Sequence, residues 1–512
     1  MNDYIFNPTG AGETAQWDDK ARREYERSVR FLFLAAAFRE CPGAKVSIEH
    51  SVHYGVYASL SQPVDKFTVA RIEQRMRKYV EEDARFVRED WPVGRLKELY
   101  EEGENSPAVR LLKRSPRVSG GGIVPVYSLD GYRDYLFGEL VESAGALRVF
   151  ELHPYAPGVV LQIPSSETGR LLKWTAQHKY MRTFEQAARW AHILNVRYAA
   201  DLNDCVRNGA IRDVALVSEA LHEKSIAELA NQIVEREARA VLVAGPSSSG
   251  KTTFTHRLAI QLRVLGKRPR LISLDDFYLP RGDIPVDENG ERDLEHIDAL
   301  NVRLLNRRLV SLLEGESVAM PKYDFMLGAA RVGEKMRLDE GQPLLIEGIH
   351  GLNPRVSESL PKDVCFRVYI SPLTALNLDA HNRLRTTDAR LIRRIVRDHQ
   401  FRGARIERTL EMWQSVRKGE ERWIFPYQET AEVSFNSALP YEWTVLKKYA
   451  EPLIRGARLE GKAREGMGST IERLQQCMDI IEEAEVERDI GPTSLLREFI
   501  GGCSFYSPSE TE

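Results

Sequence analysis

The chain has 512 residues, of which 43% are hydrophobic and 29% are charged, and its formal net charge at pH 7 is -3. This composition is close to that of ordinary globular proteins, so it excludes a mostly disordered, collagen-like or coiled-coil chain. Because the charge is nearly neutral, no chain-wide positive field recruits nucleic acid or an acidic membrane, although a local basic patch remains compatible with it.

The cysteines and the apolar runs predict a cytoplasmic protein. Five cysteines are scattered without a C-x-x-C pair, which favours a reducing compartment and disfavours both a disulfide framework and a structural zinc site. The run 31–38 starts too late and is too short for a signal peptide, and Arg39 and Glu40 follow it at once, so a buried helix is predicted there. No run reaches the length of a membrane helix, so no membrane contact is expected.

The first 210 residues predict an α+β domain without a recognisable active site. Apolar spacing predicts helices at 21–38, 69–81 and 183–194, and alternation predicts strands at 46–50 and 159–163. His50 and His53 are the only local candidates for a metal site in this region. Their spacing does not place two ligands on one helix face, and third and fourth ligands are missing, so both are interpreted as ordinary strand or turn residues.

A connecting helix is predicted at residues 211–235. Ser225 and Glu228 have the form of a capping box, which predicts a helix start at that point. Strands are then predicted, alternating with helices, at 240–244, 270–274, 343–346 and 364–371. This alternation predicts an α/β fold of P-loop type, with a parallel sheet that carries helices on both faces. We expect this unit to span 236–457 and to be followed by a helical extension and tail at 458–512.

The strongest motif is G-x4-G-K-S/T, which the segment Gly245-Pro246-Ser247-Ser248-Ser249-Gly250-Lys251-Thr252 matches without a gap. A predicted strand ends just before it and a helical pattern begins at Lys251, which is the context that a phosphate loop requires. The loop amides and the helix amino terminus favour a bound anion. Lys251 is expected to reach the terminal phosphates and the Thr252 hydroxyl to ligate Mg²⁺, and Thr253 is included in the nucleotide-binding set. A serine- and glycine-rich turn that binds nothing is the alternative.

Acidic residues follow two of the predicted strands. Asp275 and Asp276 come after the strand at 270–274, and Glu347 comes after the strand at 343–346. Carboxylates at the carboxyl ends of parallel strands lie near the phosphate loop, where they can accept a proton or help to hold Mg²⁺. The alternatives are a helix cap for the aspartates and a buried structural carboxylate or turn residue for Glu347.

The segment 390–405 is rich in arginine. Arg390, Arg393, Arg394 and Arg397 fall on one face of a predicted helix, and Arg402 follows them. Like charges so placed repel, so the arrangement calls for anions, and nucleotide phosphates are the natural candidate. We therefore predict a lid that closes on the phosphates, while a solvated helix face is the alternative.

From about 240 to 448 the chain resembles the uridine kinase and phosphoribulokinase family of P-loop kinases. The matching segments are GPSSSGKTT, SLDDFY, DLEHIDAL, PKYDF, IEGIH and RRIVRDHQFRG, in that order. The fuller pattern is similar to a bacterial nucleoside kinase subgroup in which a region like part of threonyl-tRNA synthetase precedes the kinase. Segments 48–60 and 202–209 carry that further resemblance.

The family resemblance implies an ATP- and Mg²⁺-dependent kinase and assigns a role to each matching residue. It implies that Asp275 is the general base, that Tyr278 lies near the nucleoside, that Glu295 contacts ribose beside His296, and that Tyr323 belongs to the substrate set. The implied catalytic set is Asp275, Lys251, Arg394 and Arg397; Arg402 is implied to bind nucleotide, and the implied metal ligands are Thr252, Glu347 and Asp275.

The identity of the phosphate acceptor stays open. The 5′-hydroxyl of a ribonucleoside such as uridine or cytidine is the first hypothesis, and a phosphosugar or another small alcohol is the second. The region after the YDF segment holds no histidine of the kind that helps the family to read a base. The third hypothesis is an RNA-associated nucleotide switch, but the modest charge disfavours a nucleic-acid partner. A homo-oligomer is left open.

Overall fold

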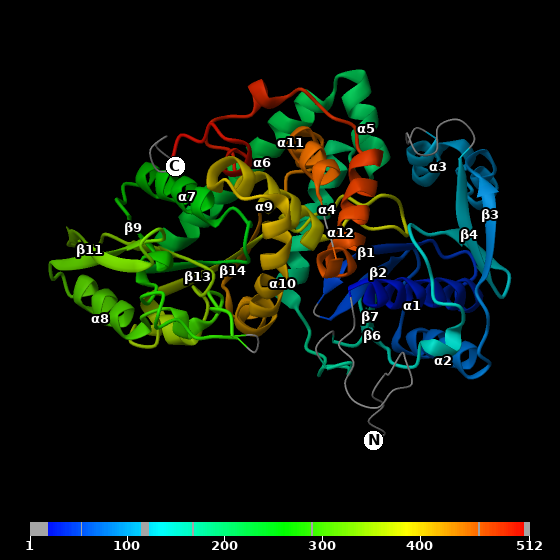
Figure 1. The fold of residues 1–512 in the computed structure, drawn as a ribbon, viewed down its shortest axis with the longest axis horizontal. Helices are drawn as coiled ribbons and strands as arrows, with labels where there is room; N and C mark the ends of the chain where they lie inside the picture. The colour runs from blue at the N-terminus through cyan, green and yellow to red at the C-terminus, as the bar shows by residue number, and fades with distance from the viewer. Residues whose placement is uncertain are drawn as a thin grey trace.

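The computed structural model describes residues 19–52, 54–113, 122–165, 168–287, 290–458 and 461–505, so His53 lies outside the described residues. Two antiparallel sheets lie in the amino-terminal part and one parallel sheet in the carboxyl-terminal part, with several helices between them (Figure 1). This arrangement confirms the predicted α/β class with an α+β region in front of it.

The amino-terminal part contains a four-stranded sheet in the order β1-β2-β7-β6 and a three-stranded sheet in the order β3-β4-β5. The strands are β1 (Val46–Val52), β2 (Gly55–Leu60), β3 (Val87–Pro92), β4 (Ile123–Leu129), β5 (Tyr132–Tyr135), β6 (Glu151–Tyr155) and β7 (Gly158–Gln162). The helices are α1 (Asp19–Glu40), α2 (Lys66–Glu81), α3 (Pro107–Leu112), α4 (His178–Leu194) and α5 (Ala199–Asn208). The helices and strands predicted in this region are present, although several begin or end a few residues away from the predicted bounds.

Helix α1 forms the centre of the amino-terminal core. The run 31–37 is buried against both sheets, and the Phe31 ring meets the Phe86 ring edge to face with 5.6 Å between centroids. This confirms the buried helix predicted for that run. His50 is buried in β1 and its ring stacks on Phe184 at 3.4 Å, so it is a strand residue packed in a core, as predicted.

The carboxyl-terminal part is built on five parallel strands in the order β14-β13-β8-β12-β9. These strands are β8 (Ala240–Ala244), β9 (Arg270–Ser273), β12 (Leu344–Glu347), β13 (Cys365–Ser371) and β14 (Val433–Asn436). The hairpin β10 (Val318–Asp324) and β11 (Ala329–Met336) forms a separate two-stranded sheet. The helices are α6 (Ile211–Glu235), α7 (Lys251–Val264), α8 (Val302–Leu313), α9 (Thr386–Arg402), α10 (Ile406–Trp423), α11 (Glu442–Gly456), α12 (Gly461–Ile480) and α13 (Arg497–Ile500).

Alternation along β8 explains why helices cover both faces of the parallel sheet. Val241 and Val243 point into a core with α6 and α7, whereas Ala240 and Leu242 point into a core with α8. Successive side chains of a strand face opposite sides, so a fully apolar strand requires cover on both. The predicted parallel sheet and the predicted strand at 240–244 are confirmed, and the structure places that strand at the centre of the sheet.

The capping box predicted at Ser225 is wrong. Helix α6 begins at Ile211 and runs without a break to Glu235, so Ser225 lies inside it. The reason is that buried positions recur at helical spacing through the whole segment, from Ile211 and Val214 to His222 and Ile226. A local match to a cap motif does not start a helix where the apolar stripe continues on both sides.

The segment between β13 and α9 is held by the amino-terminal sheets. The Ile48 amide donates to the Ala380 carbonyl at 2.7 Å, and the Asn377 amide group donates to the Ile48 carbonyl at 3.2 Å. Arg385, one residue before α9, donates to Glu26 of α1 at 3.0 Å. The amino-terminal part is therefore joined to the base of α9 through backbone and buried charge contacts.

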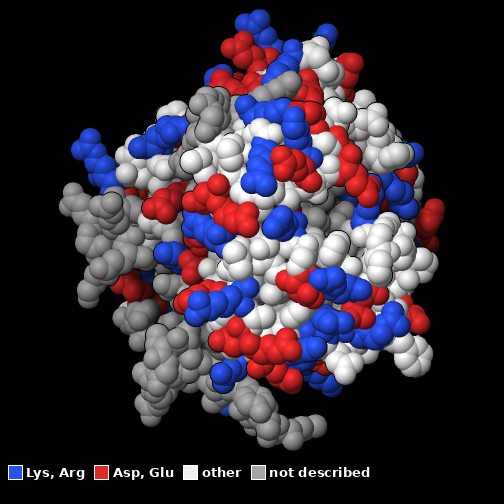
Figure 2. Space-filling view, turned by 90° about the vertical axis from the view of Figure 1, so that its right-hand side faces the viewer, with Lys and Arg blue, Asp and Glu red and all other residues white. Residues whose placement is uncertain are grey.

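The charged surface is mixed in sign on the face that Figure 2 shows. Lys and Arg alternate there with Asp and Glu, and no continuous basic stripe crosses the described residues in that view. Among the described residues, no helix combines the length and the apolar character that crossing a bilayer requires.

Candidate functional site

The carboxyl ends of three neighbouring parallel strands bring the predicted residues together. Strand β12 lies between β8 and β9, with Glu347 paired in register with Val243 and with Ser273. The phosphate-loop segment follows β8, Asp275 follows β9, and Glu347 ends β12. Three segments that are far apart in sequence therefore meet at one edge of the sheet, where ligands of open α/β sheets bind.

The backbone of the 245–252 segment is the tight loop that the glycines predict. A Cβ on Gly245 would lie 2.0 Å from the Ile370 carbonyl oxygen, so no larger residue fits beside β13. Gly250 has φ +84° at the amino cap of α7, a conformation that side chains other than glycine rarely adopt. Lys251 begins α7 and folds back to donate from Nζ to the Pro246 carbonyl at 3.2 Å. Its ammonium group therefore lies over the loop.

Glu347 and Asp275 form a close acidic pair beside this lysine. Glu347 is only 9% exposed and accepts a hydrogen bond from the Ser273 hydroxyl at 2.9 Å. Burial raises the pKa of Glu347, and the neighbouring Asp275 raises it further, to about 7. The protein around Asp275 desolvates it enough to raise its pKa, with Asp276 adding to the rise and Lys251 opposing it, although the side chain keeps an exposed surface. The charge of Asp275 thus acts on Glu347, as expected for two carboxylates at the same edge of the sheet.

The donor set fits Mg²⁺. Mg²⁺ in phosphoryl-transfer sites is held by one or two carboxylates, a hydroxyl, waters and substrate phosphates. Thr252, Glu347 and Asp275 supply that hydroxyl and those carboxylates. No cluster of three or more His, Cys, Asp or Glu with metal-binding geometry occurs within the part of the chain that the structure describes. A site completed by phosphates and water requires no such cluster.

The two adjacent aspartates after β9 have different surroundings. Asp276 accepts from the Tyr323 amide at 3.2 Å and lies 3.4 Å from Lys322 Nζ, so it ties the β10–β11 hairpin to the site. Asp275 follows Ser273, whose hydroxyl accepts its amide hydrogen at 3.3 Å, and its side chain remains exposed. Of the pair, Asp275 is therefore the carboxylate that an incoming hydroxyl can reach.

Aromatic rings line the hairpin side of the site. The rings of Tyr278 and Tyr323 are 5.7 Å apart, and that of Phe325 lies 4.9 Å from Tyr323. Tyr278 is fixed by donating its hydroxyl to the Leu294 carbonyl at 2.9 Å. The structure therefore brings the two predicted tyrosines together and adds Phe325, a neighbour in sequence that the motifs did not single out.

Glu295 and His296 lie on the loop that faces α10. A Cβ on Gly419 would come within 2.2 Å of the Glu295 Cβ, so Gly419 allows this close approach. The His296 ring contacts the Trp423 ring at 4.4 Å. Burial is the main reason that the pKa of Glu295 is raised, and the nearby carboxylate of Glu420 adds to it, so that the pKa is about 8. Glu295 therefore keeps its proton at neutral pH.

Replacing Glu295 with glutamine should flatten the pH dependence of thermal stability. The folded protein holds a proton that the unfolded chain releases above the ordinary glutamate pKa of 4.5, so this group's contribution to stability falls as the pH rises from that value through about 8. The melting temperature of Glu295→Gln, measured by scanning fluorimetry across that range, should fall less steeply than that of the wild type. Glu291→Gln, on the same loop, is the matched control. An unchanged slope in Glu295→Gln would contradict the assignment.

The predicted lid arginines on α9 do not all face the loop. Arg394 donates to the Ser247 hydroxyl at 2.8 Å, which places it at the phosphate loop. Arg397 and Arg402 approach the Asp398 carboxylate at 2.8 Å and 3.4 Å. Arg390 and Arg393 are buried and pair with Glu420 and Glu442, so the expectation that all four arginines on this face attract phosphates is wrong for these two. Protein carboxylates from α10 and α11 neutralise them instead.

Glu420 and Glu498 contact the loop and were not predicted from the sequence. The Ser247 amide donates to Glu420 at 3.2 Å, and Glu420 pairs with Arg390 and, at 2.9 Å, with Arg417. Glu498 of α13 accepts from the Thr253 amide at 3.4 Å and from its hydroxyl at 2.8 Å. No local pattern signals either residue, because each reaches the loop from a distant helix.

Replacing Glu498 with glutamine should change nucleotide affinity and stability in opposite directions. Removing a negative charge from the amino end of α7 should tighten ATP binding, because helix amino termini attract phosphates. Losing a charge-assisted hydrogen bond should lower the unfolding free energy by roughly 1.5–3 kcal/mol. Calorimetric ATP titration and denaturant unfolding measure the two effects, and Glu485→Gln is the exposed control. Weaker ATP binding in Glu498→Gln would show that this carboxylate supports the loop instead.

Comparisons with known proteins support the same assignment. Residues 240–441 match the model of the phosphoribulokinase / uridine kinase family. A uridine kinase of Halobacterium salinarum is 28% identical over 196 residues, which cover 38% of this chain and 78% of that protein. A uridine kinase of Borrelia duttonii is 30% identical over 192 residues, which cover 37% of this chain and 82% of that protein. The chain belongs to this family.

Family membership identifies residues 240–441 as a P-loop kinase domain and implies nucleotide binding there. The resemblance that the motifs predicted is confirmed over that range. A solved structure described as a possible uridine kinase from Bacillus stearothermophilus shares 18% identity, with 39% of this chain and 89% of that chain covered and a TM-score of 0.27. The family match does not extend to residues 1–239, so the similarity of the first region to threonyl-tRNA synthetase stays a prediction.

Proposed function

We propose that the protein transfers the terminal phosphoryl group of ATP, in the presence of Mg²⁺, to the 5′-hydroxyl of a ribonucleoside such as uridine or cytidine. The observation that carries this proposal is the position of Asp275. It is the accessible carboxylate of an acidic pair, at the end of the strand two places from the phosphate loop's own strand, with Lys251 close by. This is where an acceptor hydroxyl must lie for in-line transfer.

The residues divide the reaction between them. Asp275 orients the acceptor hydroxyl and accepts its proton while the new oxygen–phosphorus bond forms and the bond to the departing ADP breaks. Lys251 and the loop amides hold the phosphates, and Arg394 stabilises charge on the transferred group. Bound Mg²⁺, held by Thr252 and Glu347 with Asp275 beside it, would neutralise phosphate charge. Helix α9, whose Arg390 and Arg394 already contact Ser247, would shield the phosphates from water without a large movement.

A ribonucleoside fits the acceptor side better than a small aliphatic alcohol. Tyr278, Tyr323 and Phe325 offer flat apolar surfaces on which a planar base can pack. Glu295, protonated at neutral pH, can both donate to and accept from a sugar hydroxyl. A phosphosugar would instead use basic residues on this side, where Lys322 pairs with Asp276 while Arg281 lies near Tyr323 and Arg331 lies opposite Lys322, so it stays the second acceptor class to test.

The test is phosphoryl transfer by the purified full chain. The protein is incubated with ATP, Mg²⁺ and, separately, a panel of nucleosides, phosphosugars and small alcohols, and ADP release and product mass are measured. Turnover of a pyrimidine ribonucleoside to its 5′-monophosphate is expected. Turnover with a phosphosugar and none with nucleosides would decide for the second acceptor class. RNA binding that weakens steeply with salt, without any transfer, would favour a nucleotide switch.

A further inference from the structure

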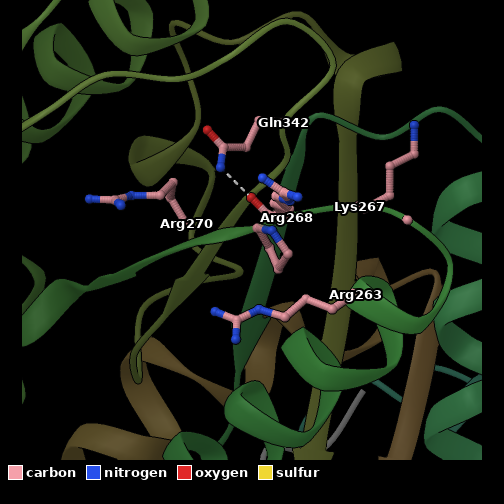
Figure 3. A pocket seen from close by; sticks show the side chains of 7 residues that line it. Arg263, Lys267, Arg268, Arg270 and Gln342 are labelled. Carbon is pink, nitrogen blue, oxygen red and sulfur yellow. Dashed lines mark hydrogen bonds between the residues drawn. The ribbon is translucent and has the colours of Figure 1, made fainter.

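A second cavity lies at the opposite end of the kinase sheet from the phosphate loop. It has a volume of about 520 Å³ and is lined by Arg263, Lys267, Arg268, Arg270 and Gln342, among others. Figure 3 shows that the four basic side chains leave the end of α7, the following turn and the start of β9 in different directions, with Arg268 near the middle and Lys267 and Arg270 on opposite sides. A cavity of this size is in the range of small-molecule sites.

The backbone that carries these cations is fixed. Gly266 has φ +79° and ends α7, and the Lys267 amide donates back to the Leu262 carbonyl at 2.9 Å. The Gln342 side chain donates to the Arg268 carbonyl, the contact drawn in Figure 3. The Arg270 amide donates to the Pro343 carbonyl at 3.0 Å. The turn is therefore a built feature of the fold.

The charge of the cavity is not compensated within the described residues. None of the four basic side chains forms an ion pair with a described carboxylate, and no acidic residue lines the cavity. The carboxyl end of α7 contributes only about half a negative charge, which is small beside four positive ones. Arg263 and Arg268 are exposed and Lys267 and Arg270 are half-buried, so water weakens their mutual repulsion, and a bound anion would remove the repulsion that remains. The positive charge of the cavity that stays without a partner is close in size to the negative charge of a triphosphate.

We propose that this cavity, the distal cation cavity, binds a compact polyphosphate anion such as the triphosphate of a nucleotide. Arginine guanidinium groups donate several hydrogen bonds in a plane that matches phosphate oxygens, and Lys267 adds a point charge. The rise of α7 from Lys251 to Arg263 is about 18 Å. One triphosphate chain therefore cannot occupy both sites, and the distal cation cavity is separate from the phosphate loop.

The same helix joins the two sites. Lys251 is the first residue of α7 and Arg263 lies in its last turn. A ligand at the distal cation cavity therefore binds the far end of the element whose near end cradles the nucleotide. The proposal concerns binding and stands whatever the acceptor of the kinase reaction proves to be.

The experiment is calorimetric titration of the full chain with inorganic tripolyphosphate and, separately, with ATP. A Lys251→Ala background weakens binding at the phosphate loop, and one saturable site per chain should remain. Adding Arg263→Ala and Arg268→Ala should weaken that site by roughly tenfold or more, since each removes charge-assisted hydrogen bonds. Adding Arg303→Ala and Arg307→Ala instead, which removes the same charge from the exposed face of α8, should leave the site unchanged.

Each outcome decides the proposal. Equal affinity for tripolyphosphate and ATP would show that the phosphate chain alone is recognised, and tighter ATP binding would show that the nucleoside contributes. No saturable site in the Lys251→Ala background, or equal losses in the two double-arginine variants, would overturn the proposal. Binding of single-stranded RNA through Arg263 and Arg268 without triphosphate binding would overturn it as well. If Lys251→Ala does not fold, the number of binding sites tests the proposal instead. The wild type should then bind two anions per chain and Arg263→Ala/Arg268→Ala only one, and equal numbers would overturn the proposal.

Discussion

Replacing Asp275 with asparagine should lower kcat by about 10²- to 10⁴-fold, the usual contribution of a general base. Asparagine keeps the shape and can still hold the acceptor hydroxyl, but it cannot take its proton. ATP affinity should change little, because the phosphates are held by Lys251 and the loop amides. Steady-state kinetics with the nucleoside acceptor and calorimetric ATP titration measure the two quantities.

Asp276→Asn is the matched control for this experiment. Asp276 is the adjacent carboxylate, and its contacts to the Tyr323 amide and to Lys322 hold the hairpin. Its replacement should act mainly on KM for the acceptor. A similar loss of kcat in both variants would contradict the distinction drawn between the two aspartates. A parallel loss of ATP affinity in Asp275→Asn would assign Asp275 to the metal or to the structure of the loop.

Replacing Glu442 with alanine should cost about 3–5 kcal/mol of unfolding free energy, because the charge of Arg393 would be left buried without its partner. Arg393 and Glu442 are 0% and 1% exposed, and Arg393 also donates to the Ser437 carbonyl at 2.8 Å. Denaturant unfolding followed by fluorescence measures the loss. Replacing both members together, as Arg393→Met/Glu442→Leu, should recover much of it.

Glu451→Ala provides the comparison on the same helix. Glu451 pairs with Arg455 and Lys447 but is partly exposed, so its loss should cost about 1 kcal/mol or less. A small effect of Glu442→Ala, similar to that of Glu451→Ala, would mean that water or another group neutralises the buried charge of Arg393 between α9, α11 and α13.

The position of the candidate site residues at one edge of the sheet could be predicted from the sequence because the signals are local. Each signal spans only a few residues of sequence: the phosphate-loop motif, the apolar strand 240–244, Asp275 just after β9 and Glu347 at the end of β12. Parallel pairing of the strands then brings these segments to one edge of the sheet. The lid was predicted less well. The partners of Arg390 and Arg393 are Glu420 and Glu442, which lie on other helices, and no spacing rule connects them. Glu498 is 245 residues away from Thr253 in the chain.

The same reasoning explains the wrong capping box at Ser225. A cap motif satisfies only a few amide groups. The length of a helix in a folded protein depends instead on how much of its apolar face packs against other elements. Likewise, the spacing of the arginines on α9 predicted that their charges repel, but it did not predict which anions neutralise them. Those anions are carboxylates that tertiary contacts bring from other helices.

The contacts between the amino-terminal sheets and the base of α9 bear on how much of the chain the kinase needs. Across that junction Ile48 pairs with Ala380 and Asn377, and Glu26 pairs with Arg385, while the Phe499 ring of α13 packs against the Arg393 guanidinium of α9. A fragment limited to 240–441 would contain every family motif yet leave backbone groups and charges near α9 without the partners that they have in the full chain. We therefore expect such a fragment to unfold at a lower denaturant concentration than the full chain does.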